Sequence, residues 1–184
     1  AGGVRPRVVH TVSNFHNPSG VTATKGTREE LANLAESYGF WIIEDDPYGR
    51  LRFDGEPQSP IPDESVIRLG SASKTLAPAL RVGWLNAPPA IVSLVERLKQ
   101  CADLCGSTLN QLMVAEMLSD TSWFESHVSN VTSEYGTRAA ALTSALDDAF
   151  GSSVEYDSPT GGMFCWIRFP RCDTRELLNV ALSH

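Results

Sequence analysis

The sequence is poor in lysine and has no long apolar run. Only three of its 184 residues are lysines, and the formal net charge is −7. A nucleic-acid-binding surface needs clustered cations, so this composition argues against one. No uniform apolar stretch approaches the roughly 20 residues of a membrane span. We therefore expect a soluble globular chain, and neither nucleic acid nor a membrane as a partner of this segment.

Cysteine is also scarce. The four cysteines are too few and too irregularly spaced for a secreted disulfide scaffold or a paired zinc site. We therefore expect a cytoplasmic location and no metal, with Cys101 and Cys105 as buried, inert thiols on one helical face. The chain lacks both an initiating Met and an apolar leader, and it ends within an amphipathic pattern. These features predict a fragment of a longer protein.

The first 44 residues predict a strand, a helix and a strand. Residues 7–12 are β-branched, and residues 40–44 are nearly continuously apolar, as in a strand buried on both faces. Between them, Thr27 and Glu30 have capping-box spacing and Gly39 stands at a helix C-terminus, which predicts a helix over 28–38. Such a unit builds a parallel sheet.

Two more strands are expected at 66–70 and 81–86. Only ten residues separate them, which is the minimum for a parallel crossover, so an antiparallel pairing stays open. A first helical pattern begins at residue 90, and a second follows beyond Gly106, from Leu109 to Leu118. A third runs from about 122 to 150, where Gly151 ends it. Short strands are then expected at 154–156 and 163–169, followed by a helix that a capping box of Asp173 and Glu176 begins.

These elements indicate an α/β fold. We expect a partial three-layer large domain with a mostly parallel sheet over residues 1–120, and a partial, smaller α+β domain over residues 121–184.

Polar clusters follow three of the predicted strands, and they can share one crevice at the carboxyl ends of the strands. After the third strand, the hydroxyls of Ser71 and Ser73 and the fork of Arg81 describe a phosphate-sized anion site. Lys74 lies beside them, and a neighbouring cation favours the neutral, nucleophilic amine that attacks a carbonyl. A structural ion pair is the alternative role for Arg81.

The other two clusters suit an aromatic ring. Asp45 is able to keep a ring nitrogen protonated, while Asn17 and Tyr48 are able to hydrogen-bond a ring oxygen. His16 is a further candidate for lining this site. Taken singly, the Asp45-Asp46 pair and the Asn17 segment are typical of turns. Together with a phosphate site and a reactive lysine, these features match the demands of pyridoxal phosphate.

Three motifs carry a family resemblance: Asn-Pro-Ser-Gly from Asn17, Asp-Asp-Pro-Tyr from Asp45, and Ser-x-Ser-Lys-x-x-x-Pro-x-x-Arg-x-Gly from Ser71. In this order and spacing they resemble the fold-type I, class I/II aminotransferases. The nearest branch is that of 2-aminoadipate aminotransferases and the aminotransferase-like domains of MocR-type regulators. The later Gly161-Gly162-Met163-Phe164 is similar to the small domain of this family.

The resemblance implies a role for each matching residue. Lys74 would form a Schiff base with pyridoxal phosphate and shuttle the substrate α-proton. Asp45 would bind the pyridine nitrogen. The phenolic oxygen would be bound by Tyr48 and Asn17, and the phosphate by Ser71, Ser73 and Arg81. The Asn17–Pro18 bond is a candidate for cis geometry.

The implied reaction moves an amino group between an amino acid and a 2-oxo acid in a homodimeric enzyme. The family's Gly-containing phosphate loop, its ring-stacking aromatic residue and its substrate-carboxylate arginine are not found in this sequence. Three alternatives therefore stay open. They are the sensing domain of a MocR-type regulator, a carbon–sulfur lyase that uses the same cofactor, and an inactive piece that folds only with its missing half.

Overall fold

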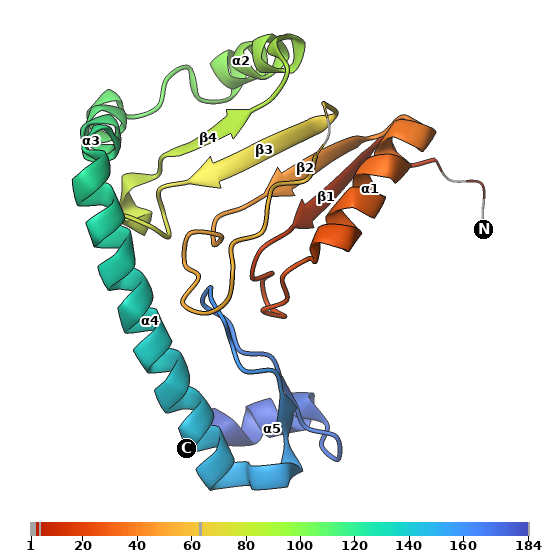
Figure 1. Cartoon of the computed structure of the whole chain (residues 1–184), viewed down its shortest axis with the longest axis vertical. Coiled ribbons are helices and arrows are strands. Elements are labelled where there is room, and N and C mark those ends of the chain that lie inside the picture. The colour runs from red at the N-terminus through yellow and green to blue at the C-terminus, as the bar shows by residue number, and fades with distance from the viewer. Residues whose placement is uncertain (1–2, 4, 63, 184) are drawn as a thin grey trace.

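A four-stranded mixed sheet forms the centre of the fold (Figure 1). The computed structural model describes residues 3, 5–62 and 64–183. The strands β1 (Val8–Val12), β2 (Trp41–Asp45) and β3 (Val66–Ser71) run parallel, and β4 (Gly83–Asn86) pairs antiparallel with β3. Between β3 and β4 there is room only for a turn and a 3-10 helix, η1 (Pro78–Leu80). The antiparallel alternative is therefore confirmed.

Helix α1 (Lys25–Tyr38) connects β1 to β2 and begins three residues before its predicted start. Its N-cap is Thr24, whose side chain accepts a hydrogen bond from the Thr27 N–H. The predicted capping box at Thr27 and Glu30 is therefore wrong in position, because a second threonine three residues earlier caps the helix. Gly39 ends the helix as predicted, in the left-handed conformation and with its N–H donated to Ala35 O.

The described core lies between α1 and the sheet. Ala32 and Ala35 on the inner face of α1 pack against buried apolar residues of β2, β3 and the connecting loops: Phe40, Ile42, Ile61 and Val66. The near-continuous apolar run at 40–43 thus forms the strand expected from it. This packing fixes β2 and β3 side by side and so positions the polar residues at their carboxyl ends.

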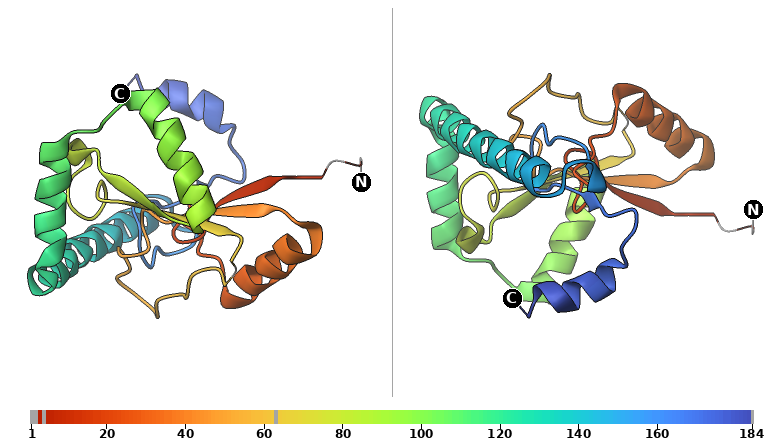
Figure 2. Two further views of the ribbon diagram at one scale, coloured as in Figure 1. Left: turned by 90° about the horizontal axis from the view of Figure 1, so that it is seen from above. Right: turned by 90° about the horizontal axis from the view of Figure 1, so that it is seen from below.

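Three helices follow the sheet: α2 (Pro89–Asp103), α3 (Thr108–Ser119) and the 30-residue α4 (Thr121–Phe150). In Figure 2, α1 and α2 lie on opposite sides of the sheet. Gly151 ends α4 as predicted. The expected burial of Cys101 and Cys105 is wrong, because both are exposed. Cys101 lies on α2, which has no buried residue in this chain, and Cys105 lies beyond the end of α2.

The C-terminal part of the chain contains two strands, and both are shorter than predicted. After a 3-10 turn, η2 (Gly151–Ser153), β5 (Glu155–Tyr156) pairs antiparallel with β6 (Ile167–Arg168). Residues 157–166, which connect β5 to β6 and are called the 157–166 excursion below, extend away from this strand pair. Within them, Gly161 forms an isolated antiparallel bridge with Arg52, so the pairing of β5 with β6 stays short. Asp173 caps α5 (Thr174–Ala181) as predicted.

Among the described residues, no helix combines the length and the apolar character needed to cross a membrane.

Candidate active site

Neighbouring parallel strands end in polar side chains. Asp45 is the last residue of β2 and Ser71 is the last residue of β3. Asp45 is in register with Leu69, and alternate residues of a strand share a face. Asp45 and Ser71 therefore lie on one side of the sheet at its carboxyl edge, where open α/β sheets bind ligands.

A hollow of about 460 Å³ opens at this edge. Four of the predicted site residues line it, together with Trp84 of β4: Asp45, Ser71, Ser73 and Arg81. The volume lies within the range of small-molecule and cofactor sites. The structure therefore brings a carboxylate, two hydroxyls and a guanidinium to one concave surface.

Arg81 reaches this hollow through a turn and not from a strand. Its φ is 53°, in the left-handed region, so it reverses the chain after η1 and β4 begins two residues later at Gly83. The predicted strand start at residue 81 is therefore wrong. The guanidinium donates one hydrogen bond to Pro78 O at 3.3 Å. Its other N–H groups make no bond within the described chain and suit an anion.

Lys74 lies on the turn between β3 and η1. The turn is closed by Ser71 Oγ, which accepts a bond from the Ser73 N–H at 3.1 Å, and by the Leu76 N–H, which donates to Ala72 O at 2.9 Å. Lys74 itself is half-buried, and the described residues offer its Nζ no hydrogen bond or ion pair. It neighbours Ser73 but is not among the residues that line the hollow.

Asn17 and Tyr48 form a pair beside Asp45, although neither lines the hollow. The Tyr48 side chain is buried, and the Asn17–Pro18 peptide is cis, as predicted. Burial raises the pKa of the Tyr48 hydroxyl, the Asp45 charge raises it further, and a hydrogen bond with Asn17 opposes both. Tyr48 therefore carries its proton at neutral pH and is able to donate it in a hydrogen bond.

The histidine that pairs with Asp45 is His10. His10 Nε2 lies 3.5 Å from Asp45 Oδ2. The structure instead places His16 on the exposed side of its loop, with Nδ1 3.0 Å from Ser19 Oγ. The signal for His10 was in the strand pattern, because Val12 is in register with Asp45 and His10 shares its face.

Behind the sheet edge lies a buried ion pair that none of the sequence motifs marks. Arg28 of α1 donates to Glu44 Oε1 at 3.1 Å, and the two side chains are only 2% and 3% exposed. Arg28 also donates to the main-chain oxygens of Ser13 and Ala23, while the Ser13 hydroxyl donates to Glu44. A carboxylate at the end of an apolar strand was the available signal, since such a charge needs a partner.

Asn14 extends this network to the loop that carries Tyr48. Its Oδ1 accepts from Arg28 and its Nδ2 donates to Asp46 Oδ2 at 2.9 Å, while Asp46 Oδ1 accepts the Gly49 N–H. Burial raises the pKa of Asp46, and the bonds from Asn14 and Gly49 partly offset this effect. A Cβ at Gly49 would lie 2.4 Å from Asp46 Oδ2, so a larger residue here would displace the carboxylate from its bonds.

The 157–166 excursion packs against the same loops. The side chain of Phe15, 1% exposed, fills the space beside Gly161 and Gly162. A Cβ at Gly161 would lie 2.1 Å from the Phe15 ring, and a Cβ at Gly162 would lie 2.4 Å from the Phe15 Cβ. The Phe164 ring meets the Tyr48 ring edge-on at a centroid distance of 5.4 Å. The glycine pair noted in the sequence therefore acts here by allowing close packing on the Asn17 loop.

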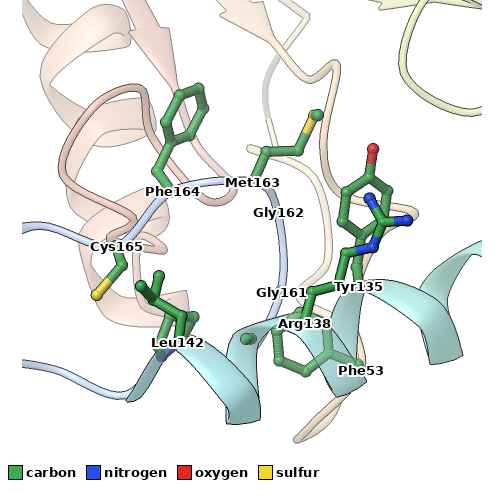
Figure 3. Close-up of a pocket in the computed structure, with 11 residues that line it drawn as sticks. Phe53, Tyr135, Arg138, Leu142, Gly161, Gly162, Met163, Phe164 and Cys165 are labelled. Carbon is green, nitrogen blue, oxygen red and sulfur yellow. The ribbon is translucent and has the colours of Figure 1, made fainter. Parts of the chain in front are cut away.

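A second, apolar pocket lies between α4 and this excursion (Figure 3). It measures about 230 Å³, and Phe53, Tyr135, Leu142 and Met163 are among its lining residues. Arg138 is the cation among its described lining residues, and it is ion-paired with Glu134 at 2.8 Å. This lining offers no free anion-binding set, so the more open hollow at the sheet edge is the better candidate for chemistry.

The fold is that of solved aminotransferases. LysN, the α-aminoadipate aminotransferase of Thermus thermophilus, was solved with N-(5'-phosphopyridoxyl)-L-leucine and matches with a TM-score of 0.90 at 33% identity. The match covers 97% of this chain and 48% of LysN. The chain belongs to the family Aminotransferase class I and II, whose sequence profile matches residues 3–183.

Two further relatives show the range of this similarity. Aromatic-amino-acid aminotransferase 1 of Thermococcus litoralis is 38% identical over 186 residues, which cover 98% of this chain and 44% of the relative. YisV of Bacillus subtilis, described as an uncharacterized HTH-type transcriptional regulator, is 32% identical over 89% of this chain and 34% of its own length. The chain thus spans less than half the length of these relatives.

Proposed function

We propose that the protein containing this chain is a pyridoxal-phosphate-dependent aminotransferase that moves an amino group between an amino acid and a 2-oxo acid. One observation carries the proposal. A single hollow at the carboxyl edge of the sheet is lined by Asp45, Ser71, Ser73 and Arg81, and Lys74 is on the same turn. Family membership and the cofactor adduct held by LysN support it.

In this proposal the phosphate is held by the turn after β3. Ser71 and Ser73 supply hydroxyl groups, and Arg81 supplies a permanently charged, planar donor that suits phosphate oxygens. These groups suit an anion at this place, because all three residues line the same hollow.

The ring would be held by residues at or just after the carboxyl ends of β1 and β2. Asp45 would bind the ring nitrogen, and its negative charge would keep that nitrogen protonated. Tyr48, which keeps its own proton because of burial, and Asn17 donate hydrogen bonds to the ring oxygen. When bound, pyridoxal phosphate supplies an electron sink that stabilises negative charge at the substrate α-carbon.

Lys74 has two roles in the proposal. Its amine would hold the cofactor as an imine, formed with release of one water from the cofactor carbonyl, and once freed it would take the α-proton from the substrate and return it on the other side of the transfer. Both roles require an amine with no permanent ion-pair partner, and Lys74 Nζ has none among the described residues.

The test compares three versions of the whole protein: wild type, Lys74→Ala and Lys25→Ala. Lys25 is a matched control because it is an exposed lysine of α1, paired with Glu29 at 3.7 Å. We expect pyridoxal phosphate and borohydride to label wild type and Lys25→Ala at Lys74, as found by peptide mapping, and to leave Lys74→Ala unlabelled. Equal labelling of all three would refute the assignment of Lys74.

Activity is tested by screening amino acids against 2-oxo acids. We expect amino-group transfer that Lys74→Ala abolishes. Release of pyruvate and a thiol in place of transfer would instead identify the carbon–sulfur lyase.

The similarity to YisV favours one second candidate, an effector-sensing domain within a transcriptional regulator. Such a protein would carry a winged helix ahead of this segment. Labelling at Lys74 without any transfer activity, together with DNA binding by the whole protein, would support the regulator over the enzyme.

We further propose a domain boundary at residue 120, where Asp120 ends α3 and caps α4.

We also propose a homodimer. Apolar side chains on α2 and α3 are exposed in this chain, including Leu98, Leu109 and Leu112, and the rest of the protein or its partner subunit would cover them. The four free cysteines support a reducing, cytoplasmic location. Sedimentation of the whole protein and fractionation of its host cells would test the last two points.

A further inference from the structure

A histidine of α4 contacts the turn that carries Lys74. His127 Nε2 lies 2.9 Å from Thr75 O, across 52 residues of sequence. A carbonyl oxygen only accepts hydrogen bonds, so Nε2 must carry the proton and donate it. Figure 1 shows the β3–β4 connection beside the junction of α3 and α4, which makes this contact possible.

The Thr75 carbonyl has few other ways to be satisfied. Thr75 is 7% exposed, and the hydrogen bonds that close the turn use Ala72 O, which accepts from both Leu76 N and Ala77 N. Buried main-chain carbonyls are nearly always paired. His127 is the partner that the described structure gives to this one.

The imidazole ring is held in place by its own helix. Trp123, one helical turn earlier, stacks on it with a centroid distance of 5.1 Å and an interplanar angle of 5°. Asp120 in turn fixes the first turn of α4 by accepting from the Trp123 N–H at 3.0 Å. The donor that meets Thr75 therefore has a defined position relative to the start of α4.

We propose that His127 is a positioning residue that holds the Lys74 turn against α4 and so fixes where the lysine amine enters the site. This inference rests on the proposed function, because it takes Lys74 to be the cofactor lysine. His127 itself touches neither cofactor nor substrate in this proposal. The link also makes the placement of Lys74 depend on the start of α4, the helix that leads into the C-terminal unit.

Two substitutions separate the donor from the ring. His127→Phe keeps an aromatic ring on Trp123 and removes the hydrogen-bond donor, whereas His127→Gln keeps an N–H donor and removes the ring. Asn110→Ala is a matched control, because Asn110 Nδ2 makes a comparable bond to Leu80 O at 2.9 Å, at the other end of the same connection.

The first measurement is hydrogen exchange of the whole, cofactor-free protein, followed in peptides that cover residues 72–77. We expect exchange about fivefold faster in His127→Phe, the size of effect that loss of one hydrogen bond predicts. We expect wild-type rates in His127→Gln and in Asn110→Ala. Peptides covering β2 serve as the reference and should not change.

The second measurement is the pyridoxal phosphate concentration that gives half-maximal borohydride labelling of Lys74. We expect it to rise about fivefold in His127→Phe and to return to the wild-type value in His127→Gln, in line with one lost bond.

Three results would overturn the inference: unchanged exchange of 72–77 in His127→Phe, equal acceleration in β2, or failure of His127→Gln to restore either value. If wild type itself is not labelled at Lys74, the proposed function fails, whereas the exchange result still decides whether His127 holds the turn.

Discussion

Removal of Arg28 tests whether the buried ion pair behind the sheet edge holds the fold together. Arg28→Met keeps an unbranched stem and deletes the guanidinium. The side chain loses its bonds to Glu44 at 3.1 Å, to Ser13 O and Asn14 Oδ1 at 2.8 Å each, and to Ala23 O at 3.0 Å. The variant therefore leaves a carboxylate, two main-chain oxygens and the Asn14 side-chain oxygen without this donor.

The expected loss follows from the burial of the pair. Removing one partner of a buried ion pair costs about 3–5 kcal/mol, because the other charge stays buried and uncompensated. Glu44 keeps a second cation, Arg68, at 3.3 Å, so we expect the lower end, about 3 kcal/mol. The matched control is Arg138→Met, whose ion pair with Glu134 is exposed and worth less than about 1 kcal/mol.

Urea unfolding of the whole protein measures both losses. With a slope of about 3 kcal/mol per molar urea, Arg28→Met should lower the midpoint by about 1 M. The double variant Arg28→Met/Glu44→Gln should lose less than the sum of the two single variants, because it removes both fully buried charges of the pair, and the cation that then lacks its anion, Arg68, is 35% exposed. A midpoint for Arg28→Met that matches Arg138→Met would refute the structural role of the pair.

The remaining predictions concern packing and titration. Gly161→Ala places a Cβ about 2.1 Å from the buried Phe15 ring and should destabilise the protein by about 2–3 kcal/mol in urea unfolding. Gly26→Ala, a helical glycine whose nearest neighbour would lie 3.9 Å away, should instead stabilise it by about 0.5–1 kcal/mol; the same sign for both would contradict this account of the packing. The Asp147 carboxylate, 2.7 Å from the Tyr156 hydroxyl, raises the pKa of Tyr156 to about 12. This contribution to stability is present below about pH 10 and is lost as pH rises through the folded value, and ultraviolet titration should find the pKa of Tyr156 closer to 10 in Asp147→Asn.

Features set by neighbours in sequence were largely predictable. The helix stop at Gly39, the caps at Gly151 and Asp173, and the buried strand at 41–45 all follow from interactions within one turn or one strand. The main local error was the start of α1, where Thr24 competes with Thr27 for the cap. Two equivalent signals three residues apart leave the boundary undecided until the chain is folded.

The site was predictable to the extent that motifs could be placed at strand ends. Asp45, Ser71 and Arg81 were expected to share a crevice, and they line one hollow. The supporting residues were not predictable, because their partners are distant in sequence: the Ser13–Glu44 bond spans 31 residues and the His127–Thr75 bond spans 52. Nothing near His127 in sequence marks it as a partner of the Lys74 turn.

The sequence by itself determined the family of the chain, the order of its motifs and most of its secondary structure. It did so because motif spacing, capping and apolar periodicity depend on residues close together in the chain and can be read without the fold. The tertiary structure decided which polar groups meet. It selected His10 over His16 beside Asp45, exposed Cys101, buried Arg28 against Glu44, and placed His127 on Thr75. Each of these outcomes depends on how helices and strands that are far apart in the sequence pack together, and the residue types at these positions do not specify that packing.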